Sequence, residues 1–173
     1  PEIKVASVRA RGAKVVLFGD TFNDALSHAL ALEKQRNLHF IHPFDDPEII
    51  AGQGTVAMEI VHQHSAKIDA VFVPVGGGGL IAGIAAYIKT VRPETQVIGV
   101  EYEESASLAA AMAVGRRVKL RQVGIFADGI AVAQVGKHTW PLMKQYVDGV
   151  ITVSSDEICA AVKDIFDDTR VIA

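Results

Sequence analysis

"AVFVPVGGGGLIAGIAAYIKTV", residues 70–91, carries the pattern that decides the fold. It starts with a short apolar run, passes through four consecutive glycines and continues with apolar residues at spacings of three and four. That order predicts a strand over 70–75, a tight turn and a helix over 80–91. Glycine is costly to order, so a run of four predicts that something approaches the bare backbone closely.

The same alternation of short apolar runs and amphipathic segments continues along the chain. Strands are predicted over residues 14–18, 39–42, 70–75, 96–101 and 149–153, and helices over 22–35, 48–62, 80–91, 105–114, 139–146 and 156–168. The irregular segment 115–134 is interpreted as an extended loop containing a strand. Apolar strands joined by helical crossovers predict an α/β domain with a mainly parallel, twisted sheet and helices on both faces.

Local capping signals support several helix starts. Asp20 or Thr21 is expected to cap the first of these helices and Asp46, before a proline, the second. Ser155, followed by two acidic residues, favours the start of the last helix.

Composition excludes several classes of partner. The chain has 173 residues, of which 50% are hydrophobic, and a net charge of -3 with scattered basic residues. It therefore predicts a globular domain that binds neither nucleic acid nor a membrane. The single cysteine, Cys159, is expected to be a packed core thiol, and it cannot form an internal disulfide, which favours the cytoplasm.

The glycine turn is predicted to bind an anion. A helix start offers amide N–H groups without intrahelical partners, and glycines let a phosphate touch the backbone. Four glycines favour this interpretation over a turn that is merely tightly packed. One candidate ligand is a dinucleotide, since Gly77, Gly79 and Ala82 fit G-x-G-x-x-A and Glu101 ends the next strand. The other is a cofactor phosphate such as that of pyridoxal phosphate, and a non-catalytic interaction module is a third possibility.

Four segments favour the second candidate when they are taken together. They are "PFDDPEIIAGQGTVAMEI" (43–60), "VFVPVGGGGLIAGIA" (71–85), "VIGVE" (97–101) and "FADGIAV" (126–132). In this order the chain resembles the pyridoxal-phosphate enzymes of the threonine dehydratase and serine racemase group. "FIHPFDDP" (40–47) and "GRRVKLRQVGIFADGIAV" (115–132) are most similar to biosynthetic threonine dehydratases, enzymes of isoleucine and branched-chain amino-acid biosynthesis.

This resemblance implies the tryptophan-synthase-β-like fold, pyridoxal-phosphate fold type II, in incomplete form. It also implies a lyase that converts L-threonine to 2-oxobutanoate and ammonia with pyridoxal 5'-phosphate, in a cytoplasmic homo-oligomer such as a tetramer. A serine dehydratase or racemase is the alternative within the group. The cofactor-binding residues implied are Gly76, Gly77, Gly78, Gly79, Leu80 and Gly129.

The resemblance also implies what the chain lacks. None of its nine lysines has the sequence context of the family's Schiff-base lysine, so that lysine is expected outside this chain, which holds no catalytic residue. The chain is expected to be an inactive internal fragment. Residues 1–46 would finish a smaller catalytic subdomain, and 47–173 would form most of the larger, cofactor-binding one.

No divalent metal site is predicted. Serine racemase and its relatives place a divalent ion near the acid that ends "VIGVE", with a second acid six residues later. Here Glu101 is followed at that spacing by Ser107, which removes one carboxylate of the kind that hard cations prefer. A monovalent ion stays possible.

Overall fold

The computed structural model describes residues 2–20 and 22–172. The chain divides into two compact units, of which one ends at Ile41 and the other begins at His42. The assignment of 1–46 and 47–173 to two catalytic subdomains stays a prediction.

In the first unit the described residues form two helices, α1 (Glu2–Ala10) and α2 (Phe22–Arg36). α1 was not predicted, and none of its residues is buried. The strands predicted over 14–18 and 39–42 are wrong, because the backbone there is irregular. A strand needs a partner for its N–H and C=O groups, and the described residues supply none for either segment. The proposed cap Thr21 lies outside the described residues.

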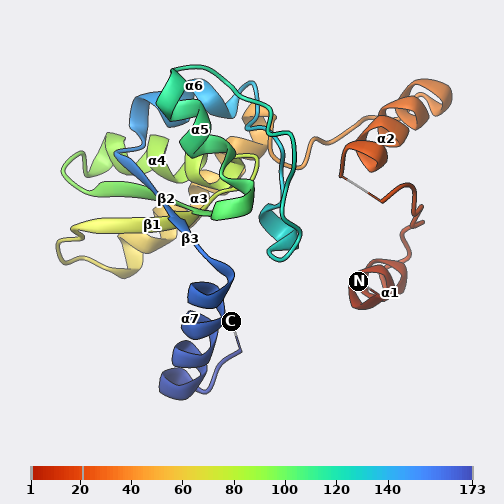
Figure 1. The fold of residues 1–173 in the computed structure, drawn as a ribbon. Coiled ribbons are helices and arrows are strands. Elements are labelled where there is room, and N and C mark those ends of the chain that lie inside the picture. The colour runs from red at the N-terminus through yellow and green to blue at the C-terminus, as the bar shows by residue number, and fades with distance from the viewer. Residues whose placement is uncertain (1, 21, 173) are drawn as a thin grey trace. The chain divides into compact units, whose positions relative to one another are not determined.

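The second unit is built on three parallel strands in the order β1 (Ala70–Pro74), β2 (Gln96–Tyr102) and β3 (Gly149–Val153) (Figure 1). Gly99 in the central strand pairs with Val73 on one side and with Val150 on the other. This sheet confirms the predicted α/β fold with parallel strands. The strands predicted over residues 70–75, 96–101 and 149–153 are each confirmed.

Five α-helices belong to this unit: α3 (Pro47–Gln63), α4 (Gly79–Val91), α5 (Ser107–Val114), α6 (Thr139–Tyr146) and α7 (Ser155–Thr169). Two short 3-10 helices are η1 (Glu103–Ser105) and η2 (Asp128–Ile130). The predicted helices are confirmed to within two residues at each end. The strand expected within 115–134 is wrong: the described backbone there forms turns and η2.

One face of the sheet packs on helices. A side chain built at Gly99 would lie 3.3 Å from Ile81 of α4 and 3.4 Å from Leu108 of α5. On the opposite face, Phe72 and Ile151 are 62% and 45% exposed. The core therefore lies between the strands and the helices α4 and α5.

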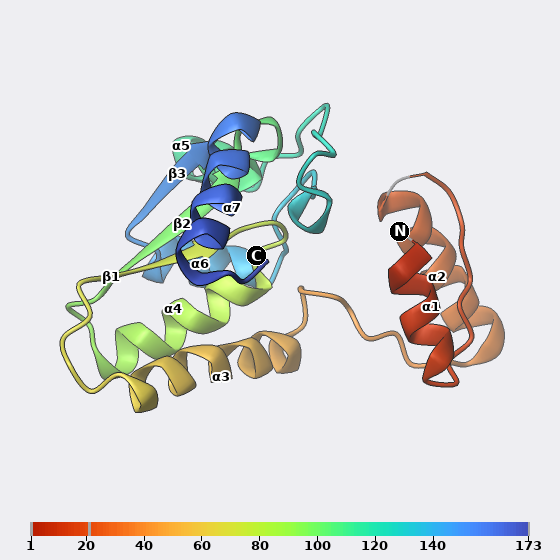
Figure 2. The same ribbon diagram turned by 90° about the horizontal axis from the view of Figure 1, so that it is seen from below.

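Helices α3 and α4 lie side by side (Figure 2), and their backbones approach each other at Gly54 and Gly83. A Cβ at Gly83 would lie 2.6 Å from the backbone N of Gly54 and would also overlap the carbonyl O of Ile50. The two glycines thus let the helix backbones touch, which fixes the direction in which α4 leaves the glycine turn.

Side chains cap the start of both α3 and α7. Asp46 caps α3 as expected, with its carboxylate accepting the amides of Glu48 (2.8 Å) and Ile49 (3.3 Å). The cap of α7 is Ser154, one residue earlier than predicted, because its side chain and that of Glu157 form a reciprocal capping box. Cys159, on the same helix, is exposed, so its assignment to the core is wrong.

Among the described helices, none combines the length and the apolar character that crossing a bilayer requires.

Candidate functional site

The glycine turn stands at the carboxyl end of β1 and leads directly into α4, whose N-cap is Gly78. Three of its residues, Gly77, Gly78 and Gly79, are buried. The amide N–H groups of residues 76–80 donate no hydrogen bond to any residue within the described part of the chain. Amides at a helix start have no intrahelical acceptor, and at the positive end of the helix dipole they are suited to bind an anion.

Close neighbours within the protein also leave little room for a side chain at the four glycines. A Cβ at Gly77 would overlap the ring of Phe44, and one at Gly79 would lie 2.9 Å from the carbonyl O of Phe44. Gly78 has φ of +93°, and a Cβ there would lie 2.6 Å from Met143. At Gly76 the nearest atom is Ile130 Cα, at 3.0 Å. Packing alone thus favours small residues here, so the number of glycines does not by itself indicate an anion. The amides of residues 76–80, which have no acceptor in the described part of the chain, do indicate one.

Gly129, the last of the predicted cofactor-binding residues, lies in η2 and is exposed. A Cβ built on it would meet no atom within 4 Å. Its neighbour Ile130 is the residue whose backbone lies against Gly76. The structure thus brings η2 to the glycine turn, while the role of Gly129 itself stays a prediction.

Two hydrogen bonds orient the turn from the side of α6. The carbonyl O of Gly77 accepts the backbone N–H of Gly136 (3.0 Å) and the hydroxyl of Thr139 (2.8 Å). Thr139 is the first residue of α6 and is fully buried.

Asp45 connects the segment before α3 to the start of α6. Its carboxylate accepts the amides of Lys137 (2.7 Å), His138 (2.6 Å) and Thr139 (3.3 Å). Burial acts to raise the pKa of Asp45, but these three hydrogen bonds outweigh it and hold the pKa below its ordinary value. The turn before it is closed by His42, whose Nδ1 accepts the amide of Asp45 at 2.8 Å.

Glu101 is not available to a ligand. It is fully buried, and its two carboxylate oxygens accept the amides of Leu108 and Ala109, each at 2.7 Å, at the start of α5. Burial raises the pKa of Glu101, although these hydrogen bonds act in the opposite direction. The dinucleotide interpretation required this carboxylate to reach a ribose, and its burial within the α5 cap contradicts that role.

The segment that begins with Glu101 offers no metal site among the described residues. Ser107, which stands where the second acid was sought, has a buried hydroxyl without a hydrogen-bond partner among the described residues. Within residues 2–20 and 22–172, no three His, Cys, Asp or Glu side chains lie close enough together to hold a metal ion.

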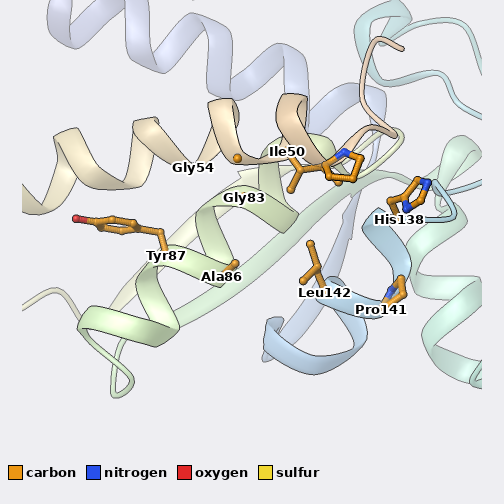
Figure 3. A pocket seen from close by; sticks show the side chains of 10 residues that line it. Ile50, Gly54, Gly83, Ala86, Tyr87, His138, Pro141 and Leu142 are labelled. Atoms are coloured by element: carbon orange, nitrogen blue, oxygen red, sulfur yellow. The ribbon is translucent and has the colours of Figure 1, made fainter. Parts of the chain in front are cut away.

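A separate groove of about 500 Å³ lies between α3, α4 and α6 (Figure 3). Ile50, Tyr87 and Leu142 line it, one from each helix, and His138 stands at its end near α6. The lining is predominantly apolar and includes none of residues 76–80. Because it lacks converging polar groups, the groove is a weaker candidate for chemistry than the glycine turn.

Sequence reasoning missed the residues that hold the glycine turn from outside. Thr139 is 62 residues away from Gly77 in the chain, and nothing in its local sequence marks it. Asp45 stands within the segment "FIHPFDDP" (40–47), but the amides that its carboxylate accepts lie 92 to 94 residues away in the chain. Only the tertiary fold brings these groups together.

Comparison with known proteins places this arrangement in a family. The family described as "Pyridoxal-phosphate dependent enzyme" matches residues 1–173. The biosynthetic L-threonine dehydratase of Burkholderia multivorans is 55% identical over 173 residues, which covers 98% of this chain and 34% of that protein. Other relatives of about 50% identity include threonine dehydratases named as chloroplastic and mitochondrial. The chain spans about a third of the length of these curated relatives.

Solved structures agree with the sequence comparison. The processed form of threonine deaminase isoform 2 from Solanum lycopersicum superposes with a TM-score of 0.94 at 49% identity, covering 99% of this chain and 50% of that one. Serine racemase from Dictyostelium discoideum has a TM-score of 0.85 at 33% identity, with 99% and 54% covered. The fold is therefore that of threonine deaminase, pyridoxal-phosphate fold type II, and the chain is a homologue of the biosynthetic threonine dehydratases.

Proposed function

Because this chain belongs to the family of pyridoxal-phosphate dependent enzymes, we propose that the whole protein is a biosynthetic threonine dehydratase. It would eliminate water from L-threonine and release 2-oxobutanoate and ammonia, the first step of isoleucine biosynthesis. The higher identity to threonine dehydratases than to a serine racemase supports threonine over serine chemistry.

The observation that carries the proposal is that the amides of residues 76–80 have no acceptor among the residues that the structure describes. They are suited to the cofactor phosphate, because the helix start supplies both the N–H donors and partial positive charge. The positive φ of Gly78 and the close neighbours of Gly77 and Gly79 fix the turn that presents these donors. When bound, pyridoxal phosphate supplies an electron sink for removal of the α-proton of the amino acid. The part of residues 76–80 is to anchor and orient the cofactor.

The lysine that carries the cofactor is placed, in this proposal, outside residues 1–173. Reduction with borohydride in the presence of pyridoxal phosphate, followed by peptide mapping of the whole protein, tests this directly. We expect no labelled lysine within 1–173. Stoichiometric labelling of one of the nine lysines of this chain would contradict the assignment.

The activity itself is tested by measuring ketoacid release from L-threonine and from L-serine by the whole natural protein with pyridoxal phosphate. The proposal requires 2-oxobutanoate from threonine, with a higher kcat/KM than for pyruvate release from serine. A preference for serine, or racemisation without ketoacid, would move the protein to another enzyme of the group. The isolated chain 1–173 is expected to be inactive in the same assay.

Two further properties belong to the proposal. We place the protein in the cytoplasm as a homo-oligomer, in keeping with the resemblance described above. Sedimentation of the whole protein tests the second point, with a tetramer as the expected species.

A further inference from the structure

We propose that Thr139 is a positioning residue for the glycine turn: its hydroxyl holds the peptide between Gly77 and Gly78 so that the Gly78 amide faces the phosphate. This inference rests on the proposed role of residues 76–80 in binding the cofactor phosphate. It assigns a function to a side chain that lies outside the turn and acts on it through the carbonyl O of Gly77.

The geometry starts at the carbonyl O of Gly77. The Thr139 hydroxyl donates to it at 2.8 Å and the Gly136 amide at 3.0 Å, so both of its lone pairs are occupied. The described part of the chain contains no cis peptide bond. In a trans peptide the C=O and the following N–H point in opposite directions. The Gly78 N–H must therefore point away from α6, on the side opposite the two donors.

The glycine turn needs such an external constraint. Glycine residues populate many backbone conformations, so four in succession do not fix the direction of their own amides. Gly78 adopts φ of +93°, which glycine reaches readily but does not prefer uniquely. Two hydrogen bonds to a single carbonyl restrict this peptide to one orientation, which lowers the entropy lost when an anion binds.

Thr139 is itself held in place. Its backbone amide and those of the two preceding residues bind the carboxylate of Asp45. A Cβ at Gly136 would lie 2.7 Å from the Thr139 hydroxyl and would overlap the Asp45 carboxylate. Asp45 thus fixes the start of α6, and Thr139 transmits that position to Gly77.

The test uses the whole natural protein as apoenzyme and compares its affinity for pyridoxal phosphate with that for pyridoxal, which lacks the phosphate. Thr139→Val keeps the shape of the side chain and removes the hydroxyl, whereas Thr139→Ser keeps the hydroxyl. We expect Thr139→Val to bind pyridoxal phosphate about tenfold more weakly, the effect of losing one hydrogen bond. Pyridoxal affinity should be unchanged, and Thr139→Ser should resemble the wild type for both ligands.

The phosphorus-31 chemical shift of bound pyridoxal phosphate provides an independent readout. It should move in Thr139→Val and stay unchanged in Thr139→Ser, because only the former alters the donors around the phosphate. Thr139→Ala is a second hydroxyl-free variant that keeps the comparison possible if Thr139→Val does not fold, and the same selective loss is required of it.

The outcomes separate the two claims. If the wild type binds pyridoxal phosphate and the hydroxyl-free variants bind it equally well, the role of Thr139 is refuted while the proposed function stands. An equal loss of affinity for pyridoxal and pyridoxal phosphate also refutes it, since the defect would then not concern the phosphate. If the wild type binds neither pyridoxal phosphate nor inorganic phosphate, the proposed function fails, and the inference fails with it.

Discussion

Asp45 and Asp46 are neighbours in the chain, yet their carboxylates cap two different helices. Asp45 accepts the amides of residues 137–139 at the start of α6, and Asp46 accepts those of residues 48 and 49 in α3. Between them and the glycine turn lies Phe44, whose ring packs against Gly77. The segment "PFDD" (43–46) therefore contacts α3, α6 and the glycine turn at the same time.

Removing either cap should destabilise the protein, with different consequences for the cofactor. Asp46→Ala should lower the free energy of unfolding by about 1 kcal/mol, and Asp45→Ala by about 2 kcal/mol because it leaves three amides without an acceptor. Only Asp45→Ala should also weaken pyridoxal phosphate binding, since only Asp45 holds α6. Urea unfolding and a cofactor titration measure the two effects, with Asp69→Ala as an exposed control. Equal affinities of Asp45→Ala and Asp46→Ala for pyridoxal phosphate would contradict the claim that only the Asp45 cap supports cofactor binding.

The cap formed by Asp45 predicts a pH dependence. Its pKa in the folded state lies below the ordinary value of 3.8, so its contribution to stability is complete above that value. The contribution is lost as the pH falls through the folded pKa. Glu101, with its raised pKa, titrates with the opposite sign. The measurement is therefore the difference in stability between the wild type and Asp45→Asn, which should shrink below about pH 4; a constant difference down to pH 2 would argue against it.

The sequence predicted those parts of the fold that depend on local pattern. The three paired strands have apolar runs bounded by turn residues, and each predicted helix has apolar residues at helical spacing. Residues 14–18 have the same strand-like composition, yet Leu17 is 71% exposed and the segment is irregular. The pattern of apolar residues indicates only that a segment is suited to a strand. The strand forms only where a neighbouring strand supplies hydrogen-bond partners.

The candidate site could be predicted only where it depends on local sequence. Residues 76–80 lie next to one another, so their common turn could be inferred from glycine content and position alone. The contacts of Thr139 and Asp45 join residues far apart in the chain, and no local spacing encodes them. Glu101 shows the opposite case: its spacing from the glycines matched a dinucleotide motif, and only its burial shows that it caps α5.

Glycines on the helices should respond to substitution in opposite directions. Gly83→Ala would place a methyl group against the backbone of α3 and should cost about 3 kcal/mol, because neither helix backbone can yield cheaply. Gly52, also in α3, has no atom within 4 Å of the corresponding position. Gly52→Ala should stabilise the protein by about 1 kcal/mol through its higher helix propensity. Urea unfolding of both variants tests the pair, and a neutral Gly83→Ala would show that α3 and α4 are less closely packed.

Glu101→Gln should be destabilising although it changes neither size nor shape. The side-chain NH₂ cannot accept a hydrogen bond, so one of the two amides at the start of α5 loses its partner, at a cost of about 2 kcal/mol. Glu103→Gln, at an exposed position in η1, should have almost no effect on stability.

Calorimetry should detect no NAD binding to the wild type. Micromolar NAD affinity that Glu101→Gln abolished would restore the dinucleotide interpretation.

The central claim is that the glycine turn holds the phosphate of pyridoxal phosphate, and the most direct measurement is a crystal structure of the whole protein with the cofactor bound. The account predicts phosphate oxygens within about 3 Å of several backbone nitrogens of residues 76–80, with the carbonyl O of Gly77 still bound to Thr139. A phosphate bound elsewhere, with these amides directed at other protein groups, would contradict it.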